Sequence, residues 1–310
     1  MIHDADSVTS ASSFGARWRL YLHQRFPLTL YVPVIAVFTW STLVYATSVR
    51  GQHESPSASA LAVAFVVVLL LFLQLRIADE FKDFEDDLRF RPYRPVPRGI
   101  ITLRGLGWLW LIAATIQATA SALLGMHVLV ALIAVWAYSG LMAREFFVRD
   151  WLKAHPVAYM ASHMVIIGLI VAYVAACAGV RASATPLLWL AGTSYLSFCV
   201  FEVGRKIRSP ADEEEGVETY SAIWGMRRAV ASWLAAMVGA GVLATFAARA
   251  MGQALPAAAV AAAIIFLAIA VAGRFLADPK PESGERFLAV SGAWLVLTFL
   301  TLGFAAWARI

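Results

Sequence analysis

Three aspartates in the first charged segment of the chain are spaced for metal chemistry. Asp79, Asp83 and Asp87 follow one another at intervals of four residues, so an unbroken helix would carry all three on one face. Carboxylates at this spacing repel one another and destabilise a helix. A hard cation such as Mg²⁺ offsets that repulsion, because it takes oxygen ligands from one or two carboxylates and from a substrate's phosphates. The spacing therefore predicts a Mg²⁺ site.

Arginines flank these aspartates on both sides. Arg76 lies about one helical turn before the first aspartate, and Arg91, Arg94 and Arg98 follow in a turn rich in proline. A guanidinium group donates paired hydrogen bonds to phosphate oxygens, so an anion site is predicted beside the metal site. The alternative is an ordinary solvated loop of mixed charge, which is what most charge runs are.

A second charged segment covers residues 201–225. The separation between Asp79 and Glu202 equals that between Asp83 and Lys206, and each of these residues lies where an apolar run enters a charged loop. This offset suggests a weak internal repeat, with two charged loops facing each other over one pocket.

The composition determines which elements carry these segments. The chain has 310 residues, of which 61% are hydrophobic and 15% charged, and its mean hydropathy is +0.72. These values exclude an ordinary soluble domain, and the long unbroken apolar runs do not alternate as β-barrel strands do. The sequence predicts an all-α polytopic membrane protein. Cys177 and Cys199 lie inside apolar runs, so we expect them to pack rather than to form a disulfide or a metal site.

Nine apolar runs are long enough to cross a bilayer, which takes about 20 residues. The predicted architecture is nine transmembrane helices around a central cavity, in a membrane domain over residues 29–310. An interfacial segment precedes it at residues 1–28, with a basic and aromatic stretch at 14–26 that is typical of a helix on a membrane surface. The active-site loops are predicted at 79–104 and 205–227. The predicted spans are 29–49, 57–78, 105–124, 126–143, 157–179, 185–204, 228–248, 254–273 and 288–308, with a break near Gly125 between the third and fourth.

The distribution of basic residues predicts the orientation. Twenty of the 25 lysines and arginines fall on one face of this arrangement, Arg76 lies inside a span, and four fall on the other face. The positive-inside rule then places the N-terminus and both charged loops in the cytoplasm, for a protein of the plasma (inner) membrane. Topology explains the net charge of +5, so nucleic acid is not an expected partner. The four residues on the other face are Arg50, Arg181, Arg249 and Arg309.

The first charged segment resembles the signature of the UbiA superfamily of intramembrane prenyltransferases. In that family an N-x-x-x-D-x-x-x-D motif precedes an R-P-x-x-x-G turn, and a second acidic cluster closes on a G-x-x-(S/T)-x-x-x-x-x-G pattern. The number of helices and the offset between the loops match as well. The matching residues are Asp79, Asp83 and Asp87, then Arg94-Pro95 and Pro97-Arg98-Gly99, and in the second motif Gly216, Thr219 and Gly225.

The sequence departs from the family pattern at two positions. Asp79 stands where the family usually has Asn, which adds a potential ligand, and Lys206 stands where an acidic ligand is expected. A protonated lysine cannot bind Mg²⁺ but can pair with a diphosphate, so a second metal would be lost or weakly held. The resemblance implies Asp79, Asp83 and Asp87 as catalytic residues and metal ligands, Glu202 and Asp212 as further ligands, and Arg76, Arg94, Arg98, Arg205 and Lys206 as diphosphate-binding residues.

The resemblance implies a Mg²⁺-dependent enzyme that transfers a prenyl group from an isoprenoid diphosphate to an aromatic or other small acceptor. Two alternatives stay open. One is a UbiA-type terpene cyclase that uses a prenyl diphosphate alone, and the other is a non-catalytic membrane protein or transporter that reuses the fold. The bilayer is the expected surrounding, and the sequence indicates no particular protein partner.

Several polar and aromatic side chains lie within the predicted spans. His163 is either a functional group, as ionisable residues inside membranes often are, or a hydrogen-bonded structural histidine. Aromatic faces could stabilise a prenyl cation, although ordinary packing is the more common role of such residues. The aromatic candidates are Trp40, Tyr138, Tyr159, Tyr195 and Phe198.

Overall fold

The computed structural model describes residues 13–51, 55–180 and 184–310, and all regular structure within these ranges is helical. Nine of the described helices have the length and hydropathy to cross a membrane, which confirms the predicted spans to within about one helical turn at each end. Gly125, with a φ of +152°, separates the third and fourth as predicted. The nine are α2 (Leu28–Val49), α3 (Ala58–Lys82), α5 (Leu103–Leu124), α6 (Met126–Ala143), α8 (Pro156–Cys177), α9 (Thr185–Gly204), α11 (Met226–Ala250), α12 (Ala254–Ala277) and α13 (Glu285–Trp307).

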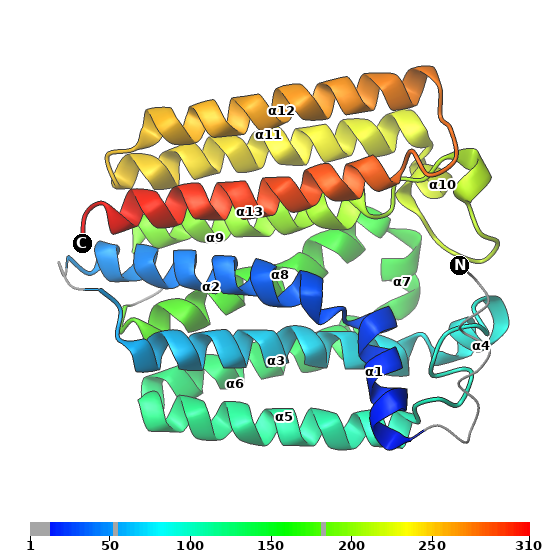
Figure 1. Ribbon diagram of the computed structural model, residues 1–310, viewed down its shortest axis with the longest axis horizontal. Coiled ribbons are helices and arrows are strands. Elements are labelled where there is room, and N and C mark those ends of the chain that lie inside the picture. The colour runs from blue at the N-terminus through cyan, green and yellow to red at the C-terminus, as the bar shows by residue number, and fades with distance from the viewer. Residues whose placement is uncertain (1–12, 52–54, 181–183) are drawn as a thin grey trace.

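The nine long helices form a closed ring in chain order. Each packs against the next, and α13 returns to pack against α2. Figure 1 shows the long helices side-on, running roughly parallel to one another. Additional contacts cross the ring, since α2 touches α8 and α13 touches α9. The integral membrane protein that the composition predicts is therefore an all-helical bundle with a packed interior.

Four short helices lie together at one end of the bundle, at the right of Figure 1. They are α1 (Phe14–Arg25), α4 (Phe84–Phe90), α7 (Arg149–Ala154) and α10 (Tyr220–Trp224). The predicted helix at 14–26 is thus present as α1, and residues 1–12 of the predicted interfacial segment lie outside the described residues. An ion pair joins Arg25 of α1 to Glu80 of α3, and Arg17 Nε donates to the Ile100 carbonyl oxygen at 2.7 Å. Both contacts attach α1 to this end.

The same end carries the charged loops. The chain enters or leaves every long helix here through the segments in which the sequence concentrates its basic residues. Arg50, Arg249 and Arg309 lie by the opposite helix ends, and Arg181 falls outside the described residues. The separation of charge between the two ends is therefore a property of the fold, and its assignment to the cytoplasmic side stays a prediction.

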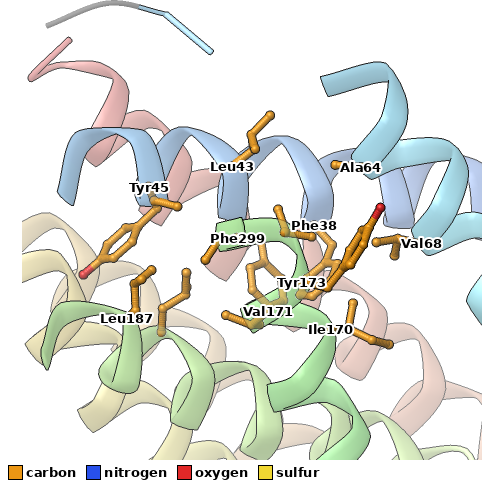
Figure 2. Close-up of a cluster of buried hydrophobic side chains, with 14 of the residues drawn as sticks. Phe38, Leu43, Tyr45, Ala64, Val68, Ile170, Val171, Tyr173, Leu187 and Phe299 are labelled. Carbon is orange, nitrogen blue, oxygen red and sulfur yellow. The ribbon is translucent and has the colours of Figure 1, made fainter. Parts of the chain in front are cut away.

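A large hydrophobic cluster fills much of the interior (Figure 2). Phe38, Tyr173 and Phe299 are among its fully buried members. Lipid is as apolar as these side chains, so close packing and hydrogen bonds hold membrane helices together. Tyr45 Oη accordingly donates to the Ala247 carbonyl oxygen at 2.8 Å, which joins α2 to α11. Cys177 and Cys199 are free and buried, as predicted.

Candidate functional site at the charged end of the bundle

The helix that carries the first aspartates ends earlier than the spacing predicts. α3 stops at Lys82, Asp83 has φ −94° and ψ 6°, and α4 begins at Phe84. The prediction of one unbroken helix through Asp87 is therefore wrong in this detail. Like-charge repulsion between neighbouring turns and the arginine partners of Asp87 described below are the physical reasons, since the segment contains no glycine or proline that would break a helix.

Asp79 and Asp83 remain close to each other despite this break. The Asp83 N–H still donates to the Asp79 carbonyl oxygen at 2.8 Å, so the two side chains lie one turn apart. Burial raises the pKa of the Asp83 carboxyl, and the charge of Asp79 raises it further, while Lys82 opposes the rise. Arg76 Nη1 lies 3.6 Å from Asp79 Oδ2. The pair is a concentration of negative charge that a cation would stabilise.

Asp87 lies in a different environment from the other two aspartates. Its side chain is 2% exposed, and Arg91 Nη2 approaches Oδ1 at 2.8 Å. Arg94 Nη1 donates to both carboxylate oxygens, at 2.9 and 2.7 Å. Arg98 follows in the same turn, where its N–H bonds the Arg94 carbonyl oxygen at 3.0 Å. Asp87 therefore organises the arginine-rich turn, with both of its oxygens engaged.

The second charged segment begins at the end of α9. Glu202 accepts from Arg205 Nε at 2.6 Å and lies 3.1 Å from Lys206 Nζ, through different oxygens. The Lys206 ammonium also lies over the Tyr220 ring, 5.4 Å from its centroid. Glu202 thus pairs with two cationic side chains at the C-terminal end of α9.

Charged side chains at the end of α3 act on those at the end of α9. Burial works against the charge of Arg205, but Glu202 outweighs it and raises the pKa of the Arg205 guanidinium. Asp79 acts in the same direction and Arg76 opposes it. The charges of the two segments are therefore close enough to act on each other.

Direct contacts join the two loops. Tyr93 Oη donates to Glu214 Oε2 at 2.9 Å, and the Phe90 ring packs on Gly216. A Cβ atom on Gly216 would lie 2.3 Å from that ring, and the residue has φ +73°. Gly216 is thus required both for its backbone conformation and for this close approach. Figure 1 shows α4 and α10 at the same end of the molecule.

The hydrogen bonds of Asp212 go to segments other than α3. Its Oδ2 accepts from Ser209 Oγ at 2.7 Å and from the Glu282 N–H at 2.9 Å. These bonds attach the second loop to the segment between α12 and α13.

The structure brings Lys82, Tyr159 and Glu145 to the site, none of which the motifs indicate. Lys82 Nζ hydrogen-bonds Tyr159 Oη and lies 3.6 Å from Glu145 Oε1. Glu145 is 4% exposed and belongs to η1 (Glu145–Phe147), a turn with positive φ angles. Sequence carries no signal for this turn, because Glu-Phe-Phe contains no glycine.

Aromatic side chains follow the charged groups into the bundle. Tyr195 Oη donates to the Ala161 carbonyl oxygen at 3.0 Å, and Phe198 lies one turn further along α9. The Phe198 ring stacks on Phe72 and meets Phe38 edge-on, with both centroid distances 5.7 Å. Of the aromatic candidates, Tyr195 and Phe198 therefore lead from the charged end into the apolar interior.

The residues present fit Mg²⁺ through one pair of carboxylates. Among the described residues, no group of three or more His, Cys, Asp or Glu side chains is arranged to hold a metal ion. Asp79 and Asp83 lie one turn apart, and among the described residues the ion pair of Asp79 with Arg76, at 3.6 Å, is longer than the contacts that engage Asp87 and Glu202. Mg²⁺ sites often use just one or two carboxylates and complete their shell with water and phosphate.

The model of the UbiA prenyltransferase family matches residues 36–302. The chain belongs to this family. The match covers all nine long helices at least in part and includes both charged loops of this UbiA family member. Among curated protein sequences, none matches it.

Solved structures share the fold of this UbiA family member. Digeranylgeranylglyceryl phosphate synthase has a TM-score of 0.63 and 15% identity, over 94% of this chain and 99% of that chain. A UbiA homologue from Aeropyrum pernix K1 has a TM-score of 0.63 and 16% identity, over 87% and 96%. A UbiA homologue from Archaeoglobus fulgidus bound to DMAPP and Mg²⁺ has a TM-score of 0.56 and 13% identity. The match covers 91% of this chain and 99% of that chain.

Proposed function

We propose that this protein is a Mg²⁺-dependent intramembrane prenyltransferase that joins the prenyl group of an isoprenoid diphosphate to an aromatic or other small acceptor. The observation that carries the proposal is the Asp79 and Asp83 pair, which lies beside Arg76 and faces Arg205 at the entrance to an apolar bundle. Family membership supports the reaction class. The Archaeoglobus homologue bound to DMAPP and Mg²⁺ supports the ligand classes.

Asp79 and Asp83 are the residues that would hold Mg²⁺. Both oxygens of Asp87 are engaged by Arg94 and both oxygens of Glu202 by Arg205 and Lys206, while Asp212 Oδ2 accepts from the Glu282 N–H. In the proposal these three carboxylates therefore position cationic side chains and loops. They could bind a metal only after those hydrogen bonds and ion pairs break.

The arginines and the lysine bind the diphosphate. Arg76 pairs with Asp79, the charge of Asp79 acts on Arg205, and Lys206 lies beside Glu202. Arg94 and Arg98 contribute further guanidinium groups from the turn after α4. Breaking the allylic C–O bond leaves negative charge on the diphosphate, and preorganised cations stabilise that charge more than they stabilise the substrate. When bound, Mg²⁺ supplies additional neutralisation of the leaving group.

In the proposal the prenyl chain inserts among the apolar side chains below the charged groups, which limit access of water. Phe198 and Phe72 present stacked faces below the charged groups, and such faces attract a cation. A prenyl cation held there would meet the acceptor before it meets water. We further propose that the charged end faces the cytoplasm of the plasma (inner) membrane, in agreement with the positive-inside rule.

A prenyl diphosphate scan tests the function. The full-length protein is purified in detergent and incubated with Mg²⁺ and diphosphates of five to twenty carbons, with and without a phenolic acceptor. Pyrophosphate release and mass spectrometry of the products are the readouts. We expect acceptor-dependent prenylated product, loss of turnover with EDTA, and at least about a hundredfold lower turnover in Asp83→Asn.

The same scan separates the alternatives. Cyclic hydrocarbon or alcohol products without acceptor would instead assign a terpene cyclase. Absence of pyrophosphate release from every diphosphate, together with an intact cellular phenotype in Asp83→Ala, would assign a non-catalytic protein or transporter. Asp86→Asn is the matched control, because Asp86 is an exposed carboxylate in the same segment and should leave turnover unchanged.

A further inference from the structure

His163 of α8 is a buried histidine with one unused ring nitrogen. The residue is 9% exposed, and its Nδ1 lies 2.8 Å from the Tyr159 carbonyl oxygen. A carbonyl oxygen can only accept, so Nδ1 carries the proton and Nε2 keeps a lone pair. Nε2 is buried and has no hydrogen-bond partner among the residues that the structure describes. Most buried polar atoms are paired, so this lone pair calls for a partner that the described part of the chain does not supply.

The surroundings of His163 connect it to the proposed active site. Its ring stacks on Tyr159, with centroids 4.0 Å apart and planes 15° apart, and Tyr159 Oη contacts Lys82. Lys82 in turn lies 3.6 Å from Glu145 Oε1. His163 therefore belongs to the charged end, although no motif includes it.

A strained turn covers the imidazole. The Phe146 ring packs edge-on against the His163 ring, with centroids 5.8 Å apart. It also packs edge-on against the Tyr138 ring, with centroids 5.5 Å apart. Glu145, Phe146 and Phe147 have φ angles of 47°, 53° and 61°, a left-handed conformation that costs about 1–2 kcal/mol per non-glycine residue. Strain of this kind persists at functional sites where the surroundings impose it. The strained turn thus places the Phe146 ring against His163.

We propose that His163 Nε2 binds the hydroxyl group of the acceptor substrate and takes its proton during transfer. The inference rests on the proposed function and deepens it, because it assigns the acceptor to the class of phenols and alcohols. A lone pair selects a hydrogen-bond donor, and an acceptor without a hydroxyl or N–H group cannot satisfy it.

The step balances without any further reactant. The allylic C–O bond breaks and its electron pair leaves with the diphosphate. The acceptor oxygen forms a new bond to the prenyl carbon, and its proton passes to Nε2. The resulting imidazolium stacks on the Tyr159 ring, and Nδ1 keeps its bond to the Tyr159 carbonyl oxygen. General base catalysis of this kind contributes about 10²–10⁴-fold.

Equilibrium binding tests the site without requiring turnover. The probes are 1-naphthol and 1-methoxynaphthalene, which differ by the donor hydroxyl, and binding to the full-length protein in detergent is measured by fluorescence. We expect wild-type protein to prefer the phenol by about two- to tenfold, the value of one buried hydrogen bond. His163→Phe, which retains a ring against Tyr159, should lose the preference. Equal binding of both probes by wild type, or a preference that survives in His163→Phe, overturns the proposal.

A second variant separates this role from a structural one. The amide of His163→Asn can still donate to the Tyr159 carbonyl oxygen but has no group at the Nε2 position. If His163 had only a structural role, His163→Asn would keep the binding preference for 1-naphthol. The proposal predicts instead that this preference is lost in His163→Asn. His155→Asn is the matched control, since His155 is an exposed histidine whose Nδ1 lies 2.8 Å from the Trp151 carbonyl oxygen, and it should retain the preference.

Turnover distinguishes failure of this inference from failure of the proposed function. With Mg²⁺ and geranyl diphosphate, His163→Phe should still release pyrophosphate, but transfer to 1-naphthol should fall by about a hundredfold or more and prenyl alcohol should replace it. Unchanged transfer in His163→Phe contradicts the role of His163 alone. Absence of pyrophosphate release in wild type contradicts the proposed function, while the binding preference still reports on His163.

Discussion

Tyr93 Oη donates a hydrogen bond to Glu214 Oε2 at 2.9 Å, and this bond connects the loop after α4 to the loop before α10. The two residues are far apart in the sequence, yet their contact lies beside the packing of Phe90 on Gly216. Both charged loops therefore behave as one structural unit at the end of the bundle.

Loss of the Tyr93 hydroxyl should weaken the loop contact in a pH-dependent way. The bond from Tyr93 lowers the pKa of Glu214, burial opposes this, and Arg208 adds to the lowering. A carboxyl with a lowered pKa in the folded state stabilises the protein at neutral pH, and this stabilisation is lost as the pH falls through the folded pKa. Tyr93→Phe should cost about 0.5 kcal/mol at pH 7, because the pair is half-exposed.

Thermal unfolding in detergent from pH 3 to pH 8 measures this effect. The difference between wild type and Tyr93→Phe should vanish at the acidic end. Glu215→Gln changes an exposed neighbouring carboxylate and serves as control. A difference that is independent of pH would contradict the role of Glu214.

Gly216→Ala should destabilise the docked loops more than a left-handed φ alone explains. Gly216 has φ +73° and would place Cβ against Phe90, while Gly99 has φ +70° and open space around it. We expect Gly99→Ala to cost about 1 kcal/mol and Gly216→Ala about 2–4 kcal/mol, because overpacking adds to the strain. Unfolding free energies check this, and partial rescue by Phe90→Ala should follow. Equal costs at the two glycines would refute the contact.

Asp83→Asn should stabilise the protein when Mg²⁺ is absent. The raised pKa of Asp83 means that the folded state favours its protonated form, so its stability is greatest at low pH and falls as the pH rises through that pKa. Removal of the charge relieves repulsion from neighbouring carboxylates, a gain of about 0.5 kcal/mol. Melting temperatures in EDTA at pH 5 and pH 8 measure it. We expect the gain to be larger at pH 8, and a loss of stability at pH 8 would disprove the electrostatic account.

Asp87→Asn should have the opposite effect. Its carboxylate is buried and neutralises Arg91 and Arg94. Removing one partner of a buried ion pair costs about 3–5 kcal/mol, since the remaining charges stay desolvated. Chemical denaturation in mixed micelles compares Asp87→Asn with Asp83→Asn. If both substitutions change stability in the same direction, the different roles assigned to the two aspartates are wrong.

Phe147→Gly should stabilise η1. Phe147 has φ 61° and is 73% exposed, so glycine removes left-handed strain and sacrifices little packing. The net gain expected is about 0.5–1 kcal/mol. Val148→Gly is the control, because Val148 has an ordinary φ of −130° and should lose stability. Melting temperatures of the two variants should move in opposite directions.

The sequence alone was sufficient for the membrane architecture. Bilayer thickness determines the length of a span, and the runs at 126–143 and 185–204 match α6 and α9 at both ends. The basic loops alternate with these runs, so the concentration of charge at one end could also be predicted. Both signals are local in sequence, which is why reading along the chain recovers them.

The tertiary structure decided which charged groups are engaged. Spacing treats Asp79, Asp83 and Asp87 alike, but only Asp87 is buried against Arg91 and Arg94, and the helix breaks at Asp83. Glu145 lies next to Lys82 because of a left-handed turn that contains no glycine, so the sequence does not indicate it. Ion pairing depends on distances between segments remote in sequence, and these distances exist only after the helices have packed. Periodicity and composition therefore determine where the charged residues gather, and packing determines which of them remain available for chemistry.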